Sequence, residues 1–157
     1  GVNRVVIGSD NEAFVNDVIR NLNLLVYNKL NVVLYGTSKI RGFETIEAEN
    51  FHNTSMKVSL GYHIDYNSPQ VKSFLLKYRA LFNTEPTQYA YQGYDITRYF
   101  VSLCYKYGDS WPQMLQKEEK EMLQNTFRFV NNEDGGYINT GVRRLSYGSD
   151  WILERIR

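Results

Sequence analysis

The sequence predicts an α/β fold in which a parallel sheet is flanked by helices and a β-hairpin lies near the C-terminal end. Short runs of β-branched and apolar residues alternate with longer stretches whose apolar residues recur every three or four positions. A turn signal of the Asp-Gly type separates two strand-like runs late in the chain. The 157 residues, of which 43% are hydrophobic, have the length of one globular domain and can enclose a core without cross-links.

The N-terminal part of the chain has a strand–helix–strand pattern. Residues 5–7 are continuously apolar, as in a parallel strand covered on both faces, and residues 32–35 form a second such run. Ser9 and Glu12 have the spacing of a capping box, so a helix is predicted over residues 11–29. Its apolar positions are Phe14, Val15, Val18, Ile19, Leu22, Leu25 and Val26. Two strands joined in this way predict a right-handed parallel crossover.

The next stretch carries a short helix signal and a further strand. Residues 41–50 can form a helix with Phe43 and Ile46 turned inward. Residues 56–62 alternate with period two, which places four side chains on one face: Met56, Val58, Leu60 and Tyr62. This strand is expected to be half-buried or to lie at an edge of the sheet.

Two longer helices are predicted in the middle of the chain. Ser68 and the proline after it are a strong helix start, and the helix continues to residue 82. The second helix opens at residues 89–95 and stops near Gly108. Its predicted inward stripe consists of Ala90, Tyr94, Thr97, Val101 and Cys104. Cys104, the single cysteine, is therefore predicted to be buried and structural.

The last part of the chain predicts a short helix and then the hairpin. Ser110 starts the helix, and the mixed charges of residues 117–121 are typical of a solvated surface. Residues 126–130 and 137–147 are strand-like and flank the turn signal of residues 131–136. We expect these two runs to pair with each other.

Charge and composition exclude several classes of protein. Eighteen basic and 17 acidic residues give a formal net charge of +1, which removes the long-range attraction that nucleic-acid and anionic-membrane binders use. No apolar run has the length of a membrane span. The chain opens with Gly1, and strand-like sequence follows almost at once, which suggests a processed chain or a piece of a longer one.

Motifs for catalysis and metal binding are missing from the sequence. It has neither of the glycine-rich phosphate loops G-x-G-x-x-G and G-x-x-x-x-G-K-[ST], and no G-x-S-x-G nucleophile elbow. The two histidines, His52 and His63, lie eleven positions apart, without the i, i+4 spacing of a helical metal pair. The sequence therefore predicts no cofactor, no metal and no enzymatic activity.

Small polar residues follow the first two predicted strands and form the candidate binding site. Ser9, Asp10 and Asn11 follow the first strand, and Thr37 and Ser38 follow the second. Parallel α/β sheets bind ligands outside the carboxyl ends of their strands, where helix N-termini also attract a carboxylate. Helix capping alone would explain each of these residues taken singly, and both interpretations stay open.

Tyrosines are candidate walls for such a site. The chain has 13 of them, and each offers a rigid apolar face with one polar tip. Most are expected to pack in the core. Tyr35 ends the second strand and Tyr66 lies at the start of a predicted element, where side chains reach a cleft more easily.

An ordered series of motifs gives the chain a family resemblance. The series is Val5-Val6-Ile7-Gly8-Ser9, Val32-Val33-Leu34-Tyr35-Gly36, Gly61-Tyr62-His63-Ile64-Asp65-Tyr66, Phe74-Leu75-Leu76-Lys77-Tyr78, Pro86, Tyr89-Ala90 and Gly93-Tyr94-Asp95. In this order it resembles the later part of type I periplasmic binding proteins, over residues 4–145. That family includes the branched-chain amino-acid-binding and receptor ligand-binding proteins that serve ABC transporters. The chain also resembles solute-binding-like proteins of Bacteroidetes that carry a separate LysM module, which is absent from this sequence.

The resemblance implies two α/β lobes that close over a small ligand, and a parent protein longer than this fragment. Residues 4–64 would form a strand/helix/strand unit of the second lobe. Residues 65–109 would form a helical segment of the first lobe, and residues 110–157 a short helix and the returning β-hairpin.

The resemblance also implies which residues face the ligand. The loops at Ser9–Asp10 and Thr37–Ser38 would line one lobe, and Tyr66 would lie near the hinge. Branched-chain binders often carry an acidic residue that pairs with the ligand ammonium, whereas this chain has Thr37-Ser38-Lys39. That departure puts amino-acid specificity in doubt.

The implied function is that of a non-enzymatic solute-binding module in the periplasm or cell envelope, with a lipid-anchored parent as one form. It would capture an amino acid or related compound for an ABC transporter, through a membrane permease, or for a sensor. The alternative is a cell-envelope scaffold that keeps the fold without binding a ligand. Unpaired strand edges in a fragment further predict a homodimer or a domain swap. No nucleic-acid partner is predicted.

Overall fold

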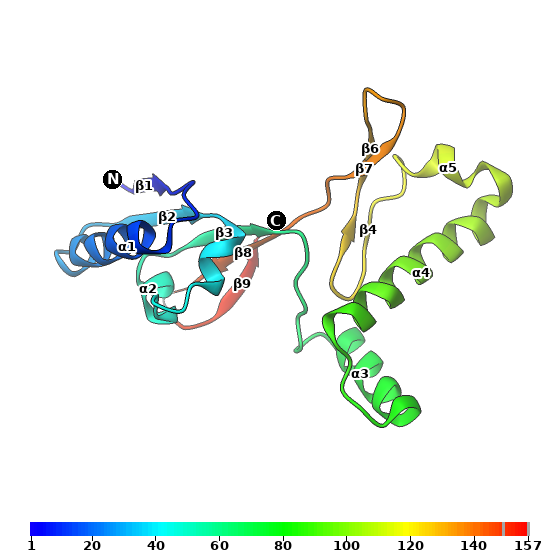
Figure 1. Cartoon of the computed structure of the whole chain (residues 1–157), viewed down its shortest axis with the longest axis horizontal. Helices are drawn as coiled ribbons and strands as arrows, with labels where there is room; N and C mark the ends of the chain where they lie inside the picture. The colour runs from blue at the N-terminus through cyan, green and yellow to red at the C-terminus, as the bar shows by residue number, and fades with distance from the viewer. Residues whose placement is uncertain (149, 157) are drawn as a thin grey trace. The chain divides into compact units, whose positions relative to one another are not determined.

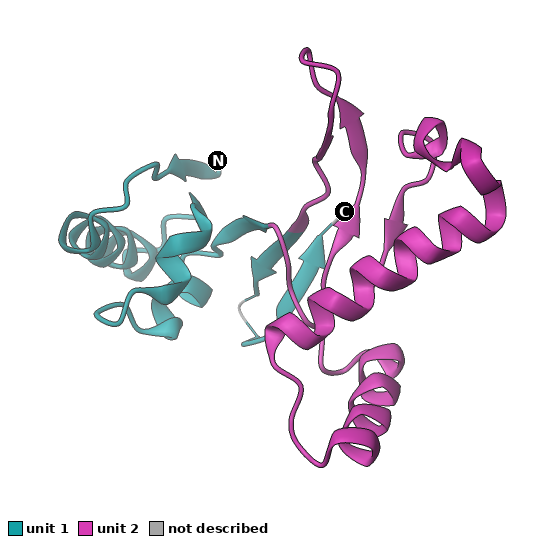
Figure 2. Ribbon diagram, turned by 45° about the vertical axis from the view of Figure 1, so that its right-hand side comes forward, with its two compact units in different colours: residues 1–60, 144–157 teal, residues 61–143 magenta. Residues whose placement is uncertain are grey.

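The computed structural model describes residues 1–148 and 150–156. The chain divides into two compact units, shown in two colours in Figure 2: unit 1 is residues 1–60 and 144–157, and unit 2 is residues 61–143. It therefore passes from unit 1 into unit 2 once and returns once. Residues 149 and 157, which belong to the predicted segment 110–157, lie outside the described residues. The division into three segments at residues 64 and 109 stays a prediction.

Unit 1 is built on a five-stranded sheet with the order β1-β2-β3-β8-β9 (Figure 1). The strands are β1 (Asn3–Val6), β2 (Val32–Gly36), β3 (Lys57–Leu60), β8 (Arg143–Tyr147) and β9 (Leu153–Ile156). β1 pairs with β2 and β2 with β3 in parallel, and Val5 lies opposite Leu34. The predicted parallel pairing of the first two strands is confirmed.

Helix α1 (Glu12–Tyr27) joins β1 to β2, and its cap differs from the prediction. The helix begins after Asn11, whose side chain accepts a hydrogen bond from the Phe14 N–H, so Asn11 and not Ser9 occupies the N-cap position. The predicted capping box is therefore wrong. Glu12 accepts hydrogen bonds from the Thr45 N–H and hydroxyl instead, at 2.9 and 2.8 Å, and these donors hold the pKa of the Glu12 carboxyl below its ordinary value.

Two short helices follow β2 in place of the predicted helix over residues 41–50. A 3₁₀ helix, η1 (Ser38–Gly42), comes first, and α2 (Ala48–Asn53) begins only after Glu47. Phe43 has extended backbone angles and ends η1, so no single helix can run through this stretch. Ile46, predicted to point inward, is buried.

The core of unit 1 lies on one face of its sheet. Buried side chains of α1, η1, α2 and the strands form a single cluster, which includes Ile19, Leu34, Ile40, Phe51 and Met56. On the other face of the sheet, Val6 is 78% exposed. The prediction that the first strand is covered on both faces is therefore wrong, because the helices of unit 1 pack into one cluster on the same side.

Strand β3 has the predicted alternation and is half-buried, which is one of the two predicted alternatives. Met56, Val58 and Leu60 are buried together, as expected. However, β3 lies between β2 and β8 and not at an edge, because the chain returns from unit 2 to form β8. Tyr62 does not continue the buried face: it is 46% exposed and forms a β-bridge with Asn125 inside unit 2.

Unit 2 combines helices with two small sheets. Its elements are α3 (Pro69–Phe82), α4 (Gln88–Tyr107), η2 (Gly108–Ser110), α5 (Trp111–Met114), β4 (Lys120–Glu121), β5 (Thr126–Phe127), β6 (Phe129–Asn131) and β7 (Tyr137–Asn139). β4 pairs with β5 and β6 with β7, both antiparallel. The two long helices match their predicted ranges. Within residues 1–148 and 150–156, no helix combines the length and the apolar character needed to cross a membrane.

The buried face of α4 is rotated from the predicted stripe. The buried residues are Tyr91, Asp95, Tyr99 and Leu103, whereas Cys104 is exposed. With 3.6 residues per turn, the buried set lies nearly on the opposite side of the helix from the predicted stripe. The cause is a polar residue, because the Asp95 carboxylate binds the backbone of residues 123–125 and turns its own side of the helix inward. The prediction of a buried Cys104 is therefore wrong.

The predicted hairpin forms, but it is shorter than expected. β6 and β7 pair across the turn of residues 132–136, where the Asn132 N–H donates to the Gly136 carbonyl at 2.8 Å. Residues 143–147 do not extend this hairpin. They form β8, which pairs in antiparallel with β9 in the sheet of unit 1. The strand-like run 137–147 is thus divided between the two units.

Gly141 separates β7 from β8, and its replacement by alanine should be destabilising. A Cβ atom at this position would lie 2.0 Å from the Thr126 carbonyl oxygen, so the backbone has to move. Overpacking of this kind costs about 3 kcal/mol of unfolding free energy. Urea unfolding followed by circular dichroism checks the value. Gly136→Ala is the control because its Cβ would meet nothing within 4 Å. Equal stabilities of the two variants would contradict the prediction.

Candidate functional site

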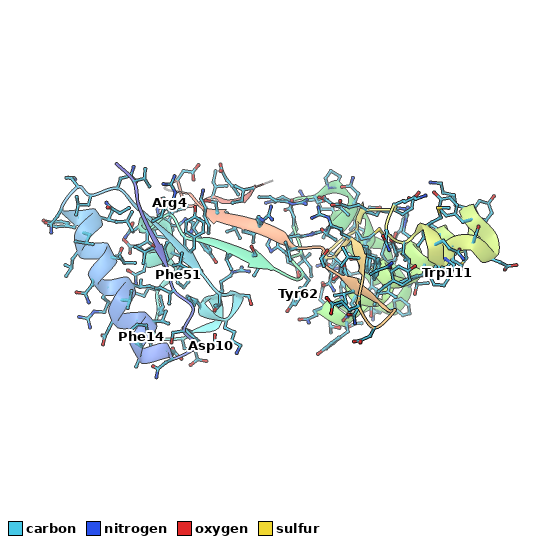
Figure 3. All side chains as sticks on the ribbon, turned by 90° about the horizontal axis from the view of Figure 1, so that it is seen from above. Arg4, Asp10, Phe14, Phe51, Tyr62 and Trp111 are labelled. Atoms are coloured by element: carbon cyan, nitrogen blue, oxygen red, sulfur yellow. The ribbon has the colours of Figure 1, made fainter. Side chains whose placement is uncertain are left out.

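The structure brings together the two loops that follow β1 and β2. The Lys39 ammonium group donates to the Asp10 carboxylate at 2.6 Å and links the loops directly. Both side chains are at least half exposed, at 67% and 50%, so the ion pair contributes little to stability and is screened by salt. Figure 3 shows Asp10 beside the start of α1. Asp10 therefore lies after the carboxyl end of β1, as predicted, and the Lys39 ammonium group is its partner.

The side chains of Ser9 and Asn11 accept hydrogen bonds from backbone N–H groups in the loop after β1 and the first turn of α1. The Ser9 hydroxyl accepts a hydrogen bond from the Asn11 N–H at 3.1 Å, and the Asn11 side chain accepts from Phe14 at 3.0 Å. Ser38 is exposed and begins η1. Capping accounts for the contacts that Ser9 and Asn11 make, and ligand contact by Ser9, Asn11 and Ser38 stays a prediction.

A depression of about 440 Å³ lies at the carboxyl end of β2, beside the first three residues of β3. All of its lining residues belong to unit 1: Tyr35, Gly36, Thr37, Lys57, Val58, Ser59, Arg144 and Ile156. The strand register sets Tyr35 opposite Lys57 and Arg144 opposite Ile156. Tyr35 and Thr37 from the predicted site thus line one depression, and Asp10 is not part of its lining.

Sequence reasoning missed the part of this depression that β3, β8 and β9 contribute. Lys57 and Ser59 alternate with the buried Val58 and Leu60, so period-two alternation in β3 predicts that they share the opposite face. Nothing in the local sequence indicates that Arg144, more than 80 positions later, returns to the same sheet. The β3–β8 neighbourhood comes from tertiary structure.

Tyr66 lies in unit 2 and does not line the depression. Its ring meets Tyr91 edge to face with the centroids 6.4 Å apart, and it remains exposed. Burial raises the pKa of the Tyr91 hydroxyl above its ordinary value. The structure thus assigns Tyr66 an aromatic contact, and its position near a ligand stays a prediction.

The Thr37 hydroxyl is an unsatisfied polar group at the depression. Its Oγ1 atom is buried and has no hydrogen-bond partner among the described residues. A buried hydroxyl without a partner loses its hydration and gains nothing in return. Such groups are uncommon in folded proteins and call for a physical reason, of which a ligand contact is one.

Replacing Thr37 with valine should therefore stabilise the protein. Removing the unsatisfied hydroxyl is expected to raise the free energy of unfolding by about 1 kcal/mol, as measured by urea unfolding. Thr54→Val is the matched control, because the fully buried Thr54 hydroxyl donates to the Asn50 carbonyl at 2.7 Å and its loss should destabilise. If both variants lost stability equally, the Thr37 hydroxyl would not be unsatisfied.

The chemistry of the lining suits binding. It offers two cations, hydroxyl groups on Tyr35, Thr37 and Ser59, and apolar contact from Val58 and Ile156. The lining has no histidine, cysteine or carboxylate to act as nucleophile or general base. Elsewhere in the described part of the chain, no three potential metal-ligating side chains gather into a metal site.

Comparisons with known proteins find the fold but no relative by sequence. No protein-family profile matches the chain, and no curated protein matches it. A branched-chain amino acid ABC transporter protein from Rhodospirillum rubrum matches with a TM-score of 0.55 at 13% identity, over 99% of this chain and 60% of that one. A substrate-binding protein of an ABC transporter from Desulfitobacterium hafniense, in complex with Leu, matches with a TM-score of 0.49 at 16% identity, over 98% and 43%.

The match to the Rhodospirillum rubrum structure supports the predicted fold class. The chain has a mixed α/β fold of the periplasmic-binding-protein kind, with a sheet that contains parallel strands and is flanked by helices. It spans less than two thirds of the length of either matched structure. At 13% identity the likeness concerns the fold alone.

Proposed function

We propose that this chain forms part of a non-enzymatic solute-binding module that captures a small molecule, an amino acid or related compound, for an ABC transporter or a sensor. The observation that carries the proposal is the depression at the carboxyl end of β2, where Tyr35, Thr37 and Ser59 combine hydroxyl groups with apolar surface. Ligands of open α/β sheets bind at this edge. The fold shared with solved ABC transporter proteins agrees with this function.

In this proposal Tyr35 forms a wall and Thr37 supplies a polar contact. The rim of the site consists of Asp10 and the neighbouring Ser9, Asn11 and Ser38. The ligand would replace Lys39 as the partner of the Asp10 carboxylate. Ligand contact by Tyr66, a residue of unit 2, belongs to the same proposal. Closure follows if the ligand binds the closed form better than the open form.

The proposal includes a place in the cell and further partners. A module of this kind works in the periplasm or at the cell envelope, with a lipid-anchored or LysM-carrying parent as two of its forms. Its partner would be a membrane permease. The sheet of unit 1 ends in the edge strands β1 and β9, and a homodimer or domain swap through such edges belongs to the same proposal.

A cell-envelope scaffold without ligand binding is the second candidate. The observation that favours it is the Lys39–Asp10 ion pair, in which the protein's own cation occupies the carboxylate of the predicted site. A scaffold of this kind would leave the depression unused.

Titration of the ¹⁵N-labelled chain with single compounds tests the proposal. The panel contains L-leucine, L-glutamate, glutarate, inorganic phosphate and soluble peptidoglycan fragments. A saturable shift of the Thr37 and Ser59 amide signals by at least one compound is expected, together with a higher melting temperature. An unchanged spectrum and melting temperature across the panel would overturn the proposal and favour the scaffold.

A further inference from the structure

Two cations lie in the depression of unit 1 without acidic partners. The side chains of Lys57 and Arg144 both line it. Neither makes an ion pair or a side-chain hydrogen bond within the described residues. Four cations elsewhere, Lys39, Arg79, Lys106 and Arg128, each pair with a carboxylate at 2.5–2.7 Å.

The two cations lie on the neighbouring strands β3 and β8, and the Arg144 side chain is exposed. Lys57 is half-buried in β3, between β2 and β8, and Tyr35 lies opposite it in the register. Arg144 stands opposite Ile156 on β9. Apolar neighbours lower the local dielectric constant, so an anion between the two cations is attracted more strongly than at a flat, hydrated surface.

The acidic residue nearest by register does not neutralise them. Glu154 lies on β9 opposite Ser146, two positions before Ile156 in the strand, and so shares a face with Arg144. It makes no ion pair with Lys57 or Arg144 among the described residues. The lining itself contains hydroxyl groups and no carboxylate that could receive a ligand ammonium group.

From this arrangement, and resting on the proposed function, we infer that the captured solute is a net anion. Its acidic group, a carboxylate or a phosphate, binds between the Lys57 ammonium and Arg144 guanidinium groups. The guanidinium can hold either group through two parallel hydrogen bonds, and the ammonium adds a point charge. A neutral zwitterion such as leucine would bring its own ammonium group toward two cations, which is repulsive.

The test compares anions with a zwitterion on the full chain and on four variants. Glutarate and inorganic phosphate are titrated against L-leucine, with the Thr37 and Ser59 amide signals as the readout. The variants are Lys57→Met, Arg144→Met, the double variant and the control Arg4→Met. Arg4 has the same charge, lies in β1 and is not among the residues that line the depression. Melting temperatures show that each variant is folded.

We expect glutarate or phosphate to bind at least tenfold more tightly than leucine. Lys57→Met and Arg144→Met should each weaken the anion at least tenfold, and Arg4→Met should leave it unchanged. Affinity of the unmodified chain should fall when NaCl rises from 20 to 500 mM. Glutarate binding alone identifies a carboxylate ligand, and phosphate binding alone a phosphate ligand.

Two other outcomes would overturn the inference and are distinct from each other. If leucine binds as tightly as the anions and the methionine variants do not change its affinity, the net-anion inference fails while the proposed function stands. If no compound in the wider panel binds, the proposed function fails as well. Salt dependence in the unmodified chain decides the question even where a variant does not fold.

Discussion

Replacing Asp95 with alanine should lower the free energy of unfolding by about 4 kcal/mol, as expected for a lost buried charge that satisfies several donors. Asp95 is fully buried in α4. Its carboxylate accepts hydrogen bonds from the backbone N–H groups of Leu123, Gln124 and Asn125 at 2.9–3.0 Å, and from the Asn125 amide at 3.1 Å. Alanine would leave these donors buried without an acceptor.

The effect should be measured by urea unfolding and by amide hydrogen exchange. Faster exchange is expected first at Leu123 and Gln124, whose N–H groups point at the carboxylate. Asp95→Asn should recover part of the loss, because its amide oxygen can still accept. Asp109→Ala, at an exposed position just after α4, is the control with the same change of charge. A cost below about 1 kcal/mol for Asp95→Ala would contradict the expected role, since that is the worth of one ordinary hydrogen bond.

The same residue shows why the buried face of α4 could not be predicted from periodicity. An apolar stripe is the usual guide to a buried helix face, and Ala90, Val101 and Cys104 fit one. The helix instead buries Asp95, since the carboxylate finds three backbone donors that lie 28 to 30 positions later. These backbone donors can be identified only from the three-dimensional position of residues 122–125 beside α4.

The strands and helices with local causes were predictable. The β-branched runs became β1 and β2, and the helix start at Pro69 held, because backbone preferences act within a few residues. Two features could not be predicted: the central position of β3, and the place of residues 143–147 in the sheet of unit 1. Both depend on β8, which joins this sheet only after the chain has passed through unit 2. The candidate site divides in the same way. Tyr35 and Thr37 follow from a strand end, whereas Arg144 reaches the depression through topology.

The loop of residues 122–125 is held by two buried side chains of opposite charge. Asp95 accepts from its N–H groups, and Arg143 donates to its carbonyl groups. Only some polar groups of this buried, irregular segment pair with other backbone groups, so the rest need acceptors and donors from side chains. Here one carboxylate and one guanidinium supply both kinds. The two residues should therefore be energetically coupled although they contact different atoms.

Replacing Arg143 with methionine should cost about 3–5 kcal/mol of unfolding free energy, as expected for a buried charged group that leaves several partners unsatisfied. The Arg143 guanidinium is buried and donates to the carbonyl oxygens of His63 and Leu123 at 2.5 and 3.1 Å. It also donates to those of Met122 and Asn125 at 2.6 and 3.0 Å. Methionine keeps much of the volume but offers no donor. Arg143→Lys should not restore the stability, because a single ammonium group cannot reproduce the several hydrogen bonds of the planar guanidinium group.

Arg144→Met is the matched control for this prediction, because it removes the same charge one position away, where the side chain is exposed. Its cost should stay within about 0.5 kcal/mol, as for an ordinary surface substitution. The double variant Asp95→Ala with Arg143→Met should lose less than the sum of the single losses, since the loop of residues 122–125 is released only once. Strict additivity of the two substitutions, or equal losses for Arg143 and Arg144, would show that the loop is held by other contacts.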